Sequence, residues 1–336
     1  MEQLANFING RFIQPKSEEY IDVFAPATGQ VYSKVPNSNS TDINIAFQAA
    51  NSAFPGWAEL TVTDRSKYLH KIAELLEHQL DDFADYESRD TGKPVTLAKS
   101  VDMPRAIANF RFFAEYGPTF KFDSEINSAQ SENRVVHAPL GVVGCISPWN
   151  LPLYLFTWKI APALIAGNTV IGKPSEITPY TAYKLGEICA NAKLPAGVLN
   201  IVHGHGITTG DALINHEGVK AISFTGGTAT GKIIAQKTAG SFKKLSLEMG
   251  GKNPAIIFSD CNYNKMLESI VKSSFSNQGQ ICLSSSRILI QAEIFEQFKQ
   301  DFIGKVTELI VGDPQDNRSN LGAVSSKNHF EKIMNY

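Results

Sequence analysis

The sequence predicts an α/β protein built on a doubly wound parallel sheet. Short apolar runs bounded by Gly and Pro alternate with amphipathic segments of helical period from residue 140 to residue 250. Such runs are typical of strands that are buried on both faces and connected through helices. Polar or glycine-rich turns follow five of these runs in succession. Because parallel sheets bind ligands at the carboxyl ends of their strands, these turns mark the expected binding edge.

Composition narrows the class of protein. The chain has 336 residues, 43% of them hydrophobic and 19% charged, which is typical of a globular protein with two domains or one large α/β domain. The net charge of −2 comes from interspersed charges, which argues against nucleic acid or a membrane surface as a partner. No apolar or Arg-rich targeting segment opens the sequence. We therefore expect a cytoplasmic protein.

The cysteines predict neither a disulfide framework nor a metal site. They are few for so long a chain, and no two of them form a CxxC pair. The four are Cys145, Cys189, Cys261 and Cys282. A reducing compartment and no bound metal are the expectations.

The first part of the chain combines a hairpin with helices. Residues 7–13 predict a hairpin with Asn9-Gly10 at its tip. Helices are expected from Thr41 or Asp42, from Asp64 to the Gly92 and Pro94 region, and over residues 102–116. We assign residues 1–116 and 140–250 to one domain.

Residues 117–139 differ from both flanks. Polar and apolar residues alternate over residues 120–122 and 134–137, with a polar turn region between them. This pattern predicts a protruding two-stranded hairpin. Exposed strand edges of this kind often pair with another subunit.

The rest of the chain alternates regularly between strands and helices. The expected strands cover residues 142–147, 169–173, 199–203, 221–225 and 244–248, with helices over 152–166, 179–192, 208–215 and 228–239. A second βα pattern begins after residue 250, with strands at 254–258 and 287–290 and helices at 264–277, 293–309 and 327–336. We assign residues 251–336 to a separate, incomplete α/β domain.

One cysteine stands out by its surroundings. Cys282 follows a polar turn that contains Gly279 and precedes a run of small residues that ends at Arg287. A reactive thiolate needs a polar, accessible site rich in backbone N–H donors, and this stretch supplies one. The alternative is a small buried hydrophobe, the usual state of an isolated cysteine.

Two strand-end motifs are candidates for a dinucleotide site. The turn from Gly226 to Gly231 follows a strand and opens a helix, as a phosphate-binding turn does, although it is not GxGxxG and a purely structural turn would look the same. Lys173 and Glu176 could hydrogen-bond a ribose, and the carboxylate would favour NAD over NADP by repelling a 2′-phosphate. The alternative for Lys173 and Glu176 is a surface ion pair.

Two further residues complete a possible catalytic set. The amide of Asn150 could donate to a developing oxyanion, or it could cap the following helix. Glu248, in an otherwise apolar strand end, could be a partly buried general base, or its carboxylate could be satisfied by local backbone N–H groups. No histidine lies near Cys282 in the sequence, which argues against a papain-like cysteine–histidine pair.

These residues lie in motifs that resemble the NAD(P)-dependent aldehyde dehydrogenase superfamily, from the N-terminus through Tyr336. The motifs are Pro148-Trp149-Asn150, Lys173-Pro174-Ser175-Glu176, Phe224-Thr225-Gly226-Gly227-Thr228, Leu247-Glu248-Met249-Gly250-Gly251-Lys252-Asn253-Pro254 and Asn277-Gln278-Gly279-Gln280-Ile281-Cys282. Two further segments are similar to the 2-aminomuconate and 2-hydroxymuconate semialdehyde dehydrogenase branch. These segments are Asp102-Met103-Pro104-Arg105-Ala106 and Asn109-Phe110-Arg111-Phe112-Phe113-Ala114.

The resemblance implies a mechanism. Cys282 would attack the aldehyde, and the Asn150 amide and the Cys282 backbone N–H would stabilise the oxyanion. Hydride transfer to NAD would leave a thioester, which a water activated by Glu248 would hydrolyse.

The resemblance also implies the binding residues. Lys173 and Glu176 would hold the adenosine ribose, and Gly227 and Thr228 would lie against the pyrophosphate. The other strand-end residues expected at the cofactor are Ser147, Trp149, Gly206, Gly226, Gly231 and Met249. Tyr154 and Trp158 would line the aldehyde tunnel. Arg105, or alternatively Arg111, would bind the distal carboxylate of a muconate-type substrate; either could instead be a structural ion pair.

The sequence also departs from the family. Chains of this family continue past residue 336, so the expected catalytic domain lacks later motifs and the strand that pairs with a partner's hairpin. A homo-oligomer is expected where that strand is present. The alternatives are a non-catalytic NAD-binding or heteromer-forming fragment, and an enzyme for betaine-type or aliphatic aldehydes.

Overall fold

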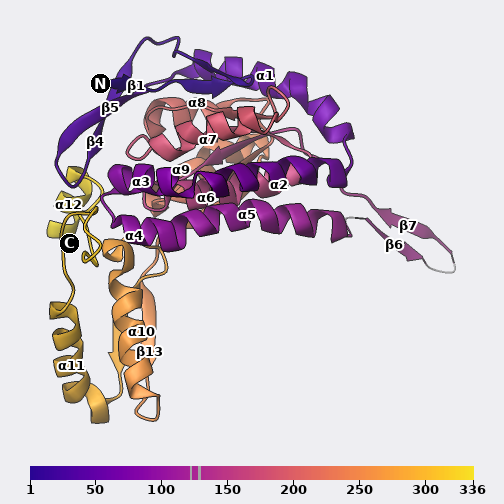
Figure 1. Ribbon diagram of the computed structural model, residues 1–336. Coiled ribbons are helices and arrows are strands. Elements are labelled where there is room, and N and C mark those ends of the chain that lie inside the picture. Colours follow the sequence, from indigo (N-terminus) through magenta and orange to yellow (C-terminus); the bar gives the residue numbers. More distant parts are fainter. Residues whose placement is uncertain (122, 128–129) are drawn as a thin grey trace.

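The structure is a computed structural model that describes residues 1–121, 123–127 and 130–336. A seven-stranded sheet with the strand order β12-β11-β8-β9-β10-β2-β3 forms its centre (Figure 1). Its parallel strands are β8 (Val142–Ile146), β9 (Thr169–Lys173), β10 (Leu199–Ile201), β11 (Ala221–Gly226) and β12 (Lys244–Met249). The α/β class and the doubly wound sheet are therefore confirmed.

The order of these strands creates a switch point. The chain passes from β8 outward through β9 to β10, and then returns to place β11 on the other side of β8. At such a reversal the connections leave in opposite directions and open a crevice at the carboxyl ends of the two strands. The ends of β8 and β11 are therefore the expected place for a ligand.

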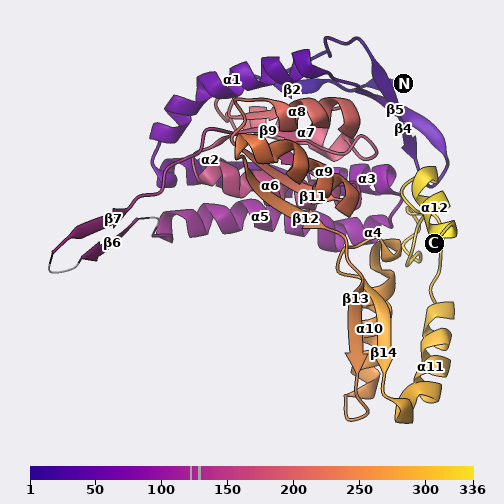
Figure 2. The ribbon, with the colours of Figure 1, turned by 180° about the vertical axis from the view of Figure 1, so that it is seen from behind.

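Helices cover both faces of the sheet (Figures 1 and 2). One face packs against α1 (Ser40–Glu59), α8 (Asp211–Asn215) and α9 (Thr228–Thr238). The other face packs against a layer of α2 (Val62–His78), α3 (Leu80–Thr91), α5 (Met103–Tyr116), α6 (Pro152–Ile165) and α7 (Tyr180–Asn191). All residues of β8 and β9 are buried, which is why β8 is a continuous apolar run and the centre of β9 is apolar between Thr169 and Lys173.

The amino-terminal segment adds two small elements. The hairpin β2 (Asn6–Ile8) and β3 (Arg11–Ile13) extends the central sheet beside β10, with Asn9 and Gly10 at the predicted turn. A separate three-stranded sheet contains β1 (Glu2–Gln3), β5 (Gln30–Pro36) and β4 (Tyr20–Ala25).

Two sequence predictions were wrong in detail. The single helix expected from Asp64 to the Gly92 region is divided into α2 and α3 at Gln79, whose φ of −111° and ψ of 22° are not helical. The first strand of the exposed hairpin was expected over residues 120–122. The N–H of Phe120 instead bonds back to Tyr116 at the end of α5, and Phe122 lies outside the described residues. The hairpin pairs β6 (Ser124–Asn127) with β7 (Glu132–Val135) and projects from one side of the molecule (Figure 2).

The last part of the chain forms a separate layer that extends away from the central sheet (Figure 1). Its two strands are parallel, and a small core of its own holds them against their helices. The elements are β13 (Asn253–Ile257), β14 (Ser285–Ile290), α10 (Tyr263–Phe275) and α11 (Phe295–Thr307). The last helix, α12 (Lys327–Met334), lies apart from this layer, near β4 (Figures 1 and 2). We propose to keep the predicted division at residues 116, 139 and 250 as the domain boundaries.

Short turns complete the backbone. They are α4 (Val95–Leu97), η1 (Ala98–Asp102), η2 (Gly117–Thr119), η3 (Gly206–Gly210), η4 (Ala239–Ser241), η5 (Ser276–Gly279) and η6 (Ala292–Ile294). Within the described part of the chain, none of the helices has the length and apolar character needed to cross a bilayer.

Candidate active site

A cleft of about 1280 Å³ opens at the carboxyl ends of β8 and β11, where the strand order reverses. It reaches from the end of β9 to the turn before β14. Most of the predicted site residues line it: Ser147, Trp149, Asn150, Lys173, Glu176, Gly206, Gly226, Gly227, Met249 and Cys282. Residues that are up to 135 positions apart in the sequence, such as Ser147 and Cys282, thus share one surface.

Cys282 is exposed in this cleft, three residues after an unusual turn. Asn277, Gln278 and Gly279 all have left-handed backbones, with φ of 55°, 57° and 71°. These values end α10 sharply and direct the chain into the cleft. The carbonyl oxygen of Cys282 accepts a hydrogen bond of 2.5 Å from Asn253. Among the described residues, no group accepts a hydrogen bond from its N–H.

The alternative of a buried, inert thiol applies to two other cysteines. Cys145 and Cys189 are buried, and burial raises the pKa of each thiol to about 12. Neither is ionised to a useful extent at neutral pH. Cys282 is exposed to the cleft, so the surroundings select it as the candidate nucleophile.

Asn150 contacts the segment that carries Cys282. Its side-chain nitrogen donates to the carbonyl oxygen of Gln280 at 2.7 Å. It does not cap α6, which begins without any side-chain cap, so the helix-cap alternative was wrong. An amide nitrogen carries two protons, so one N–H is still available to a substrate oxygen.

Glu248 is placed differently from the sequence expectation. It was expected to be partly buried, but it is exposed because β12 is the edge strand of the sheet. Glu248 is not among the described residues that line the cleft, although its neighbour Met249 is. Lys159, a buried lysine of α6, lies close enough to Glu248 to interact with it electrostatically.

Lys173 and Glu176 form a built-in pair at the opposite end of the cleft. Lys173 is 2% exposed, and its ammonium group lies 3.0 Å from the Glu176 carboxylate. Burial opposes ionisation of Glu176, but the charge and hydrogen bond of Lys173, with help from His205, hold the pKa of this carboxyl below its usual range. The surface-pair alternative was wrong, because Lys173 is buried and both residues face the cleft.

The glycine turn leaves room for a ligand. Helix α9 begins at Thr228 without a side-chain cap, so its first N–H groups are open to an anion. A Cβ atom at Gly206 or Gly227 would project into open space, and both glycines line the cleft. The buried hydroxyl of Ser147 at the end of β8 has no hydrogen-bond partner among the described residues. These features fit a dinucleotide.

Two residues of the predicted phosphate turn are not part of the cleft lining. Thr228 and Gly231 lie on α9, outside the described lining residues. A Cβ atom at Gly231 would lie 2.4 Å from the sulfur of Met249, so this glycine allows α9 to pack against β12. The predicted cofactor role of Gly231 therefore has a packing explanation.

The predicted substrate residues lie on α5 and α6. Tyr154 is half-buried and Trp158 is 49% exposed, with ring centroids 6.5 Å apart. Arg111 is held by Glu77 in a two-point ion pair. Arg105 is exposed and has no ion-pair partner among the described residues. None of the four lies among the described residues that line the cleft. Of the two arginines, Arg105 is the one whose guanidinium group is not engaged by a carboxylate of the described residues.

Sequence reasoning missed several residues at this site. His329 and Lys332 of α12 line the cleft, and the His329 ring lies 4.6 Å from that of Trp149. Their spacing of three residues on a predicted helix was the available signal. Lys159 was recognisable as a charge inside an apolar helix. Lys93 gave no local signal, since its partners Asp102 and Asn150 lie 9 and 57 residues away in the sequence.

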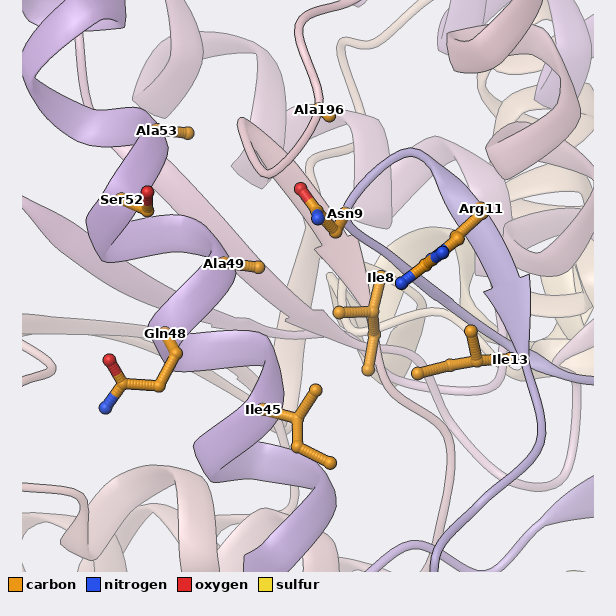
Figure 3. A pocket seen from close by; sticks show the side chains of 10 residues that line it. All are labelled: Ile8, Asn9, Arg11, Ile13, Ile45, Gln48, Ala49, Ser52, Ala53 and Ala196. Carbon is orange, nitrogen blue, oxygen red and sulfur yellow. The ribbon is translucent and has the colours of Figure 1, made fainter.

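A second, smaller hollow lies between the β2–β3 hairpin and α1 (Figure 3). Its volume is about 450 Å³, and none of the predicted site residues lines it. The lining residues are Ile8, Asn9, Arg11, Ile13, Ile45, Gln48, Ala49, Ser52, Ala53 and Ala196. Its described lining residues include no cysteine, histidine or carboxylate that could activate the Ser52 hydroxyl, so we assign the chemistry to the larger cleft.

Comparison with known proteins agrees with this geometry. The model of the aldehyde dehydrogenase family matches residues 12–336. The chain belongs to the aldehyde dehydrogenase family. The 2-aminomuconic semialdehyde dehydrogenase of Homo sapiens is 48% identical over 334 residues, which cover 99% of this chain and 68% of that relative. The 2-hydroxymuconic semialdehyde dehydrogenase of Pseudomonas sp. (strain CF600) is 40% identical over 342 residues, which cover 100% of this chain and 70% of that relative.

Solved structures agree with the fold of this aldehyde dehydrogenase. The NAD+ complex of the aldehyde dehydrogenase from Bacillus cereus matches it with a TM-score of 0.97 at 33% identity, covering 100% of this chain and 69% of that one. The family resemblance and the fold class predicted from the sequence are both confirmed. The protein is an oxidoreductase that acts on small-molecule aldehydes with a nicotinamide cofactor.

Proposed function

We propose that this aldehyde dehydrogenase oxidises a carboxylated, muconate-type semialdehyde to the acid, with Cys282 as nucleophile and NAD as cofactor. One observation carries the proposal. The Asn150 amide is fixed 2.7 Å from the carbonyl oxygen of Gln280, two residues before Cys282, in a cleft that continues to Lys173 and Glu176. A nucleophile, an oxyanion donor and a ribose-binding pair thus line one surface.

The residues of the chain divide the chemistry as follows. The Cys282 thiolate attacks the carbonyl carbon and forms a C–S bond, while the carbonyl electron pair moves to oxygen. The free N–H of the Asn150 amide and the Cys282 N–H donate to this oxyanion. A bound nicotinamide supplies the acceptor for the hydride that leaves the same carbon, so that a thioester of Cys282 remains. Glu248 is outside the described cleft lining but directly precedes the lining residue Met249, and we assign it the proton of the water that attacks the thioester; the thiolate then leaves.

The preference for NAD rests on Glu176. Its carboxylate is ionised at neutral pH, because Lys173 lowers its pKa. An ionised carboxylate accepts hydrogen bonds from ribose hydroxyls but repels a 2′-phosphate.

The nucleophile is tested by following NADH absorbance with NAD and a muconate-type semialdehyde. Cys282→Ala should abolish turnover and leave NAD binding intact. Cys261 is a half-buried free thiol outside the cleft lining, so Cys261→Ala is the matched control and should retain turnover. NAD binding without turnover in the unsubstituted chain would favour the alternative, a non-catalytic NAD-binding protein.

The substrate class rests on Arg105 and on the muconic semialdehydes that the relatives are named for. The guanidinium group of Arg105 is unpaired among the described residues and could bind a distal carboxylate. Arg105→Ala should raise KM for carboxylated semialdehydes at least about tenfold, the effect of about 1.4 kcal/mol, and change KM for neutral aliphatic or betaine-type aldehydes little. Arg111→Ala is the control from the same helix. Equal effects of Arg105→Ala on both substrate classes would show that Arg105 does not bind the distal carboxylate.

Two broader expectations remain proposals. The exposed edges of β6 and β7 support a homo-oligomer in which another copy covers the hairpin. The thiols Cys145, Cys189, Cys261 and Cys282 are all free, which supports a reducing, cytoplasmic location.

A further inference from the structure

A fully buried ion pair lies behind the candidate oxyanion site. The ammonium group of Lys93 is 2.5 Å from the carboxylate of Asp102, and both side chains are at most 1% exposed. Lys93 follows the end of α3, and Asp102 ends the π-helical turn η1 before α5. A buried pair of this kind is costly to desolvate and is weak evidence for a stabilising role. Another reason for its presence is therefore worth seeking.

The pair makes one contact that points to the catalytic side of the molecule. The Lys93 ammonium group also donates to the backbone carbonyl oxygen of Asn150 at 3.2 Å. The same oxygen accepts a second hydrogen bond, 3.0 Å long, from the side chain of Asn277. Two donors from distant parts of the chain thus fix the backbone of the residue that supplies the oxyanion donor.

These contacts extend to the turn that carries the nucleophile. The Asn277 amide also lies 3.4 Å from the Gln280 carbonyl oxygen, which is the acceptor of the Asn150 side chain. The Gln280 side chain donates back to Asn277, and its oxygen accepts from the N–H of Ser325. Lys93, Asn150, Asn277 and Gln280 thus form one connected network that ends two residues before Cys282.

The turn needs such support because its backbone is strained. Asn277 and Gln278 are both left-handed without being glycine, which costs about 1–2 kcal/mol per residue. A strained conformation persists only where surrounding contacts determine it. The two hydrogen bonds on the Asn150 carbonyl oxygen join this turn to the buried pair.

We propose that Lys93, oriented by Asp102, is a positioning residue that holds Asn150 and the left-handed turn in register, so that the Asn150 amide and Cys282 face the same substrate carbonyl. Lys93 touches neither substrate nor cofactor. It acts through the Asn150 backbone, and its removal shifts the oxyanion donor relative to the nucleophile. This inference rests on the catalytic roles proposed above for Asn150 and Cys282.

The first test is a double-mutant cycle on turnover. Lys93→Met keeps most of the side-chain length and removes the hydrogen-bond donor. We expect it to lower kcat about 100-fold, which is the effect of a misplaced catalytic group. The Kd for NAD, measured by calorimetry, should stay within about twofold of the value for the unsubstituted protein. In an Asn150→Ala background the same substitution should have almost no further effect on kcat. An equal loss in both backgrounds would overturn the proposal.

A stability control separates positioning from folding. Arg65 is another buried cation that donates to backbone carbonyls, including that of Ile165 at 2.9 Å, and it is not among the residues that line the cleft. Arg65→Met should lower the free energy of unfolding but leave kcat per folded molecule unchanged. If Lys93→Met behaves like Arg65→Met, the role of Lys93 is structural only.

A third measurement is independent of turnover. Hydrogen–deuterium exchange of the peptide covering residues 276–283 should accelerate at least about tenfold in Lys93→Met and stay unchanged in Arg65→Met. Asp102→Asn retains a hydrogen-bond acceptor, so it should give a smaller acceleration, and it replaces Lys93→Met in this measurement if Lys93→Met does not fold. Unchanged exchange in both Lys93→Met and Asp102→Asn would overturn the proposal. If the unsubstituted chain oxidised no aldehyde, the proposed function would fail, and the exchange measurement would still decide the positioning role.

Discussion

Glu176 is held ionised by a buried ammonium group, that of Lys173, 3.0 Å away. The geometry of this pair differs from that of Lys184 and Glu187 on α7, which have the same spacing and a 2.8 Å contact but lie outside the cleft lining. The Lys173 side chain is 3% exposed, which fixes its partner, whereas the side chains of Lys184 and Glu187 are only partly buried, at 19% and 41% exposure. The same sequence pattern thus gives a cleft pair in one place and a partly buried pair outside the cleft lining in another.

Substitution of Glu176 should change cofactor selectivity. Glu176→Gln removes the charge that repels a 2′-phosphate and keeps the shape of the side chain. We expect the ratio of kcat/KM for NADP to that for NAD to rise at least about tenfold, since like charges near a protein surface repel by several kcal/mol. Steady-state rates with both cofactors measure the ratio. Glu187→Gln is the matched control, and a similar rise in that variant would count against the assignment.

Single residues were predictable where their motif was local. The candidate roles of Asn150, Lys173 and Glu176 follow from strand-end motifs and that of Cys282 from the polar turn before it, and the cleft gathers these residues. The exposure of Glu248 was not predictable, because it depends on β12 being an edge strand. The role of Lys93 was not predictable either, because its two partners, the Asp102 carboxylate and the Asn150 carbonyl oxygen, come together only through the packing of distant segments.

At the scale of elements, Asp90 joins three parts of the fold. It lies near the end of α3 and is fully buried. Its carboxylate accepts hydrogen bonds from the hydroxyl of Tyr32 in β5 and, at 2.8 Å, from the N–H of Tyr180 at the start of α7. Burial raises the pKa of Asp90 to about 7, although these hydrogen bonds and the charge of Arg89 oppose the shift.

The raised pKa of Asp90 predicts a pH-dependent stability. Because the folded pKa of about 7 exceeds the unfolded value of about 4, the contribution is complete below pH 4 and is lost as the pH rises through 7. The free energy of unfolding should therefore fall by up to about 1.4 kcal/mol per pH unit in this window, relative to Asp90→Asn. Urea unfolding of both proteins from pH 4.5 to pH 8 measures the difference. A difference independent of pH would refute the prediction.

Helices and strands with a clear pattern of apolar residues were predictable, but the points at which they break were not. The parallel strands β8, β9, β11 and β12 lie within a few residues of the predicted ranges, because continuous apolar runs specify buried strands. The break at Gln79 has no Gly or Pro to announce it. The shift of the exposed hairpin arises from the N–H of Phe120, which continues the end of α5.

At the scale of the whole molecule, the layer after residue 250 is covered on one face only. Ile257 of β13 is buried against α10, whereas Ile256 is 62% exposed. Leu289 of β14 is paired with Ile256 in register and is 54% exposed. These two side chains form an apolar pair on the open face of the two-stranded sheet.

This open face predicts self-association of the chain. The double substitution Ile256→Thr and Leu289→Thr should reduce light scattering at high protein concentration, because an exposed apolar sheet face promotes aggregation. The free energy of unfolding should change by less than about 0.5 kcal/mol, as is usual at exposed positions. Ile257→Thr, on the buried face of the same strand, should instead cost about 1–3 kcal/mol. Unchanged scattering in the double variant would contradict the prediction.

The large-scale arrangement was predictable in part. The alternation of strands and helices specified the doubly wound sheet and the edge at which its ligand site lies. The order β12-β11-β8-β9-β10, which sets the position of the cleft, depends on crossovers between distant strands. Which helices cover each face of the sheet depends on the same long-range packing. The sequence indicates only that each helix has one apolar side.

The placement of Trp149 gives the molecule an intrinsic optical reporter. The chain has three tryptophans: Trp57 is 2% exposed in the core, Trp158 is half exposed on α6, and Trp149 lies in the cleft beside His329. Burial and the neighbouring Lys332 lower the pKa of His329, so at neutral pH its ring is uncharged. Occupation of the cleft should therefore change the emission of Trp149, and Trp149→Phe should remove that signal. Ligands can then be screened on the unlabelled protein, including ligands that are never turned over.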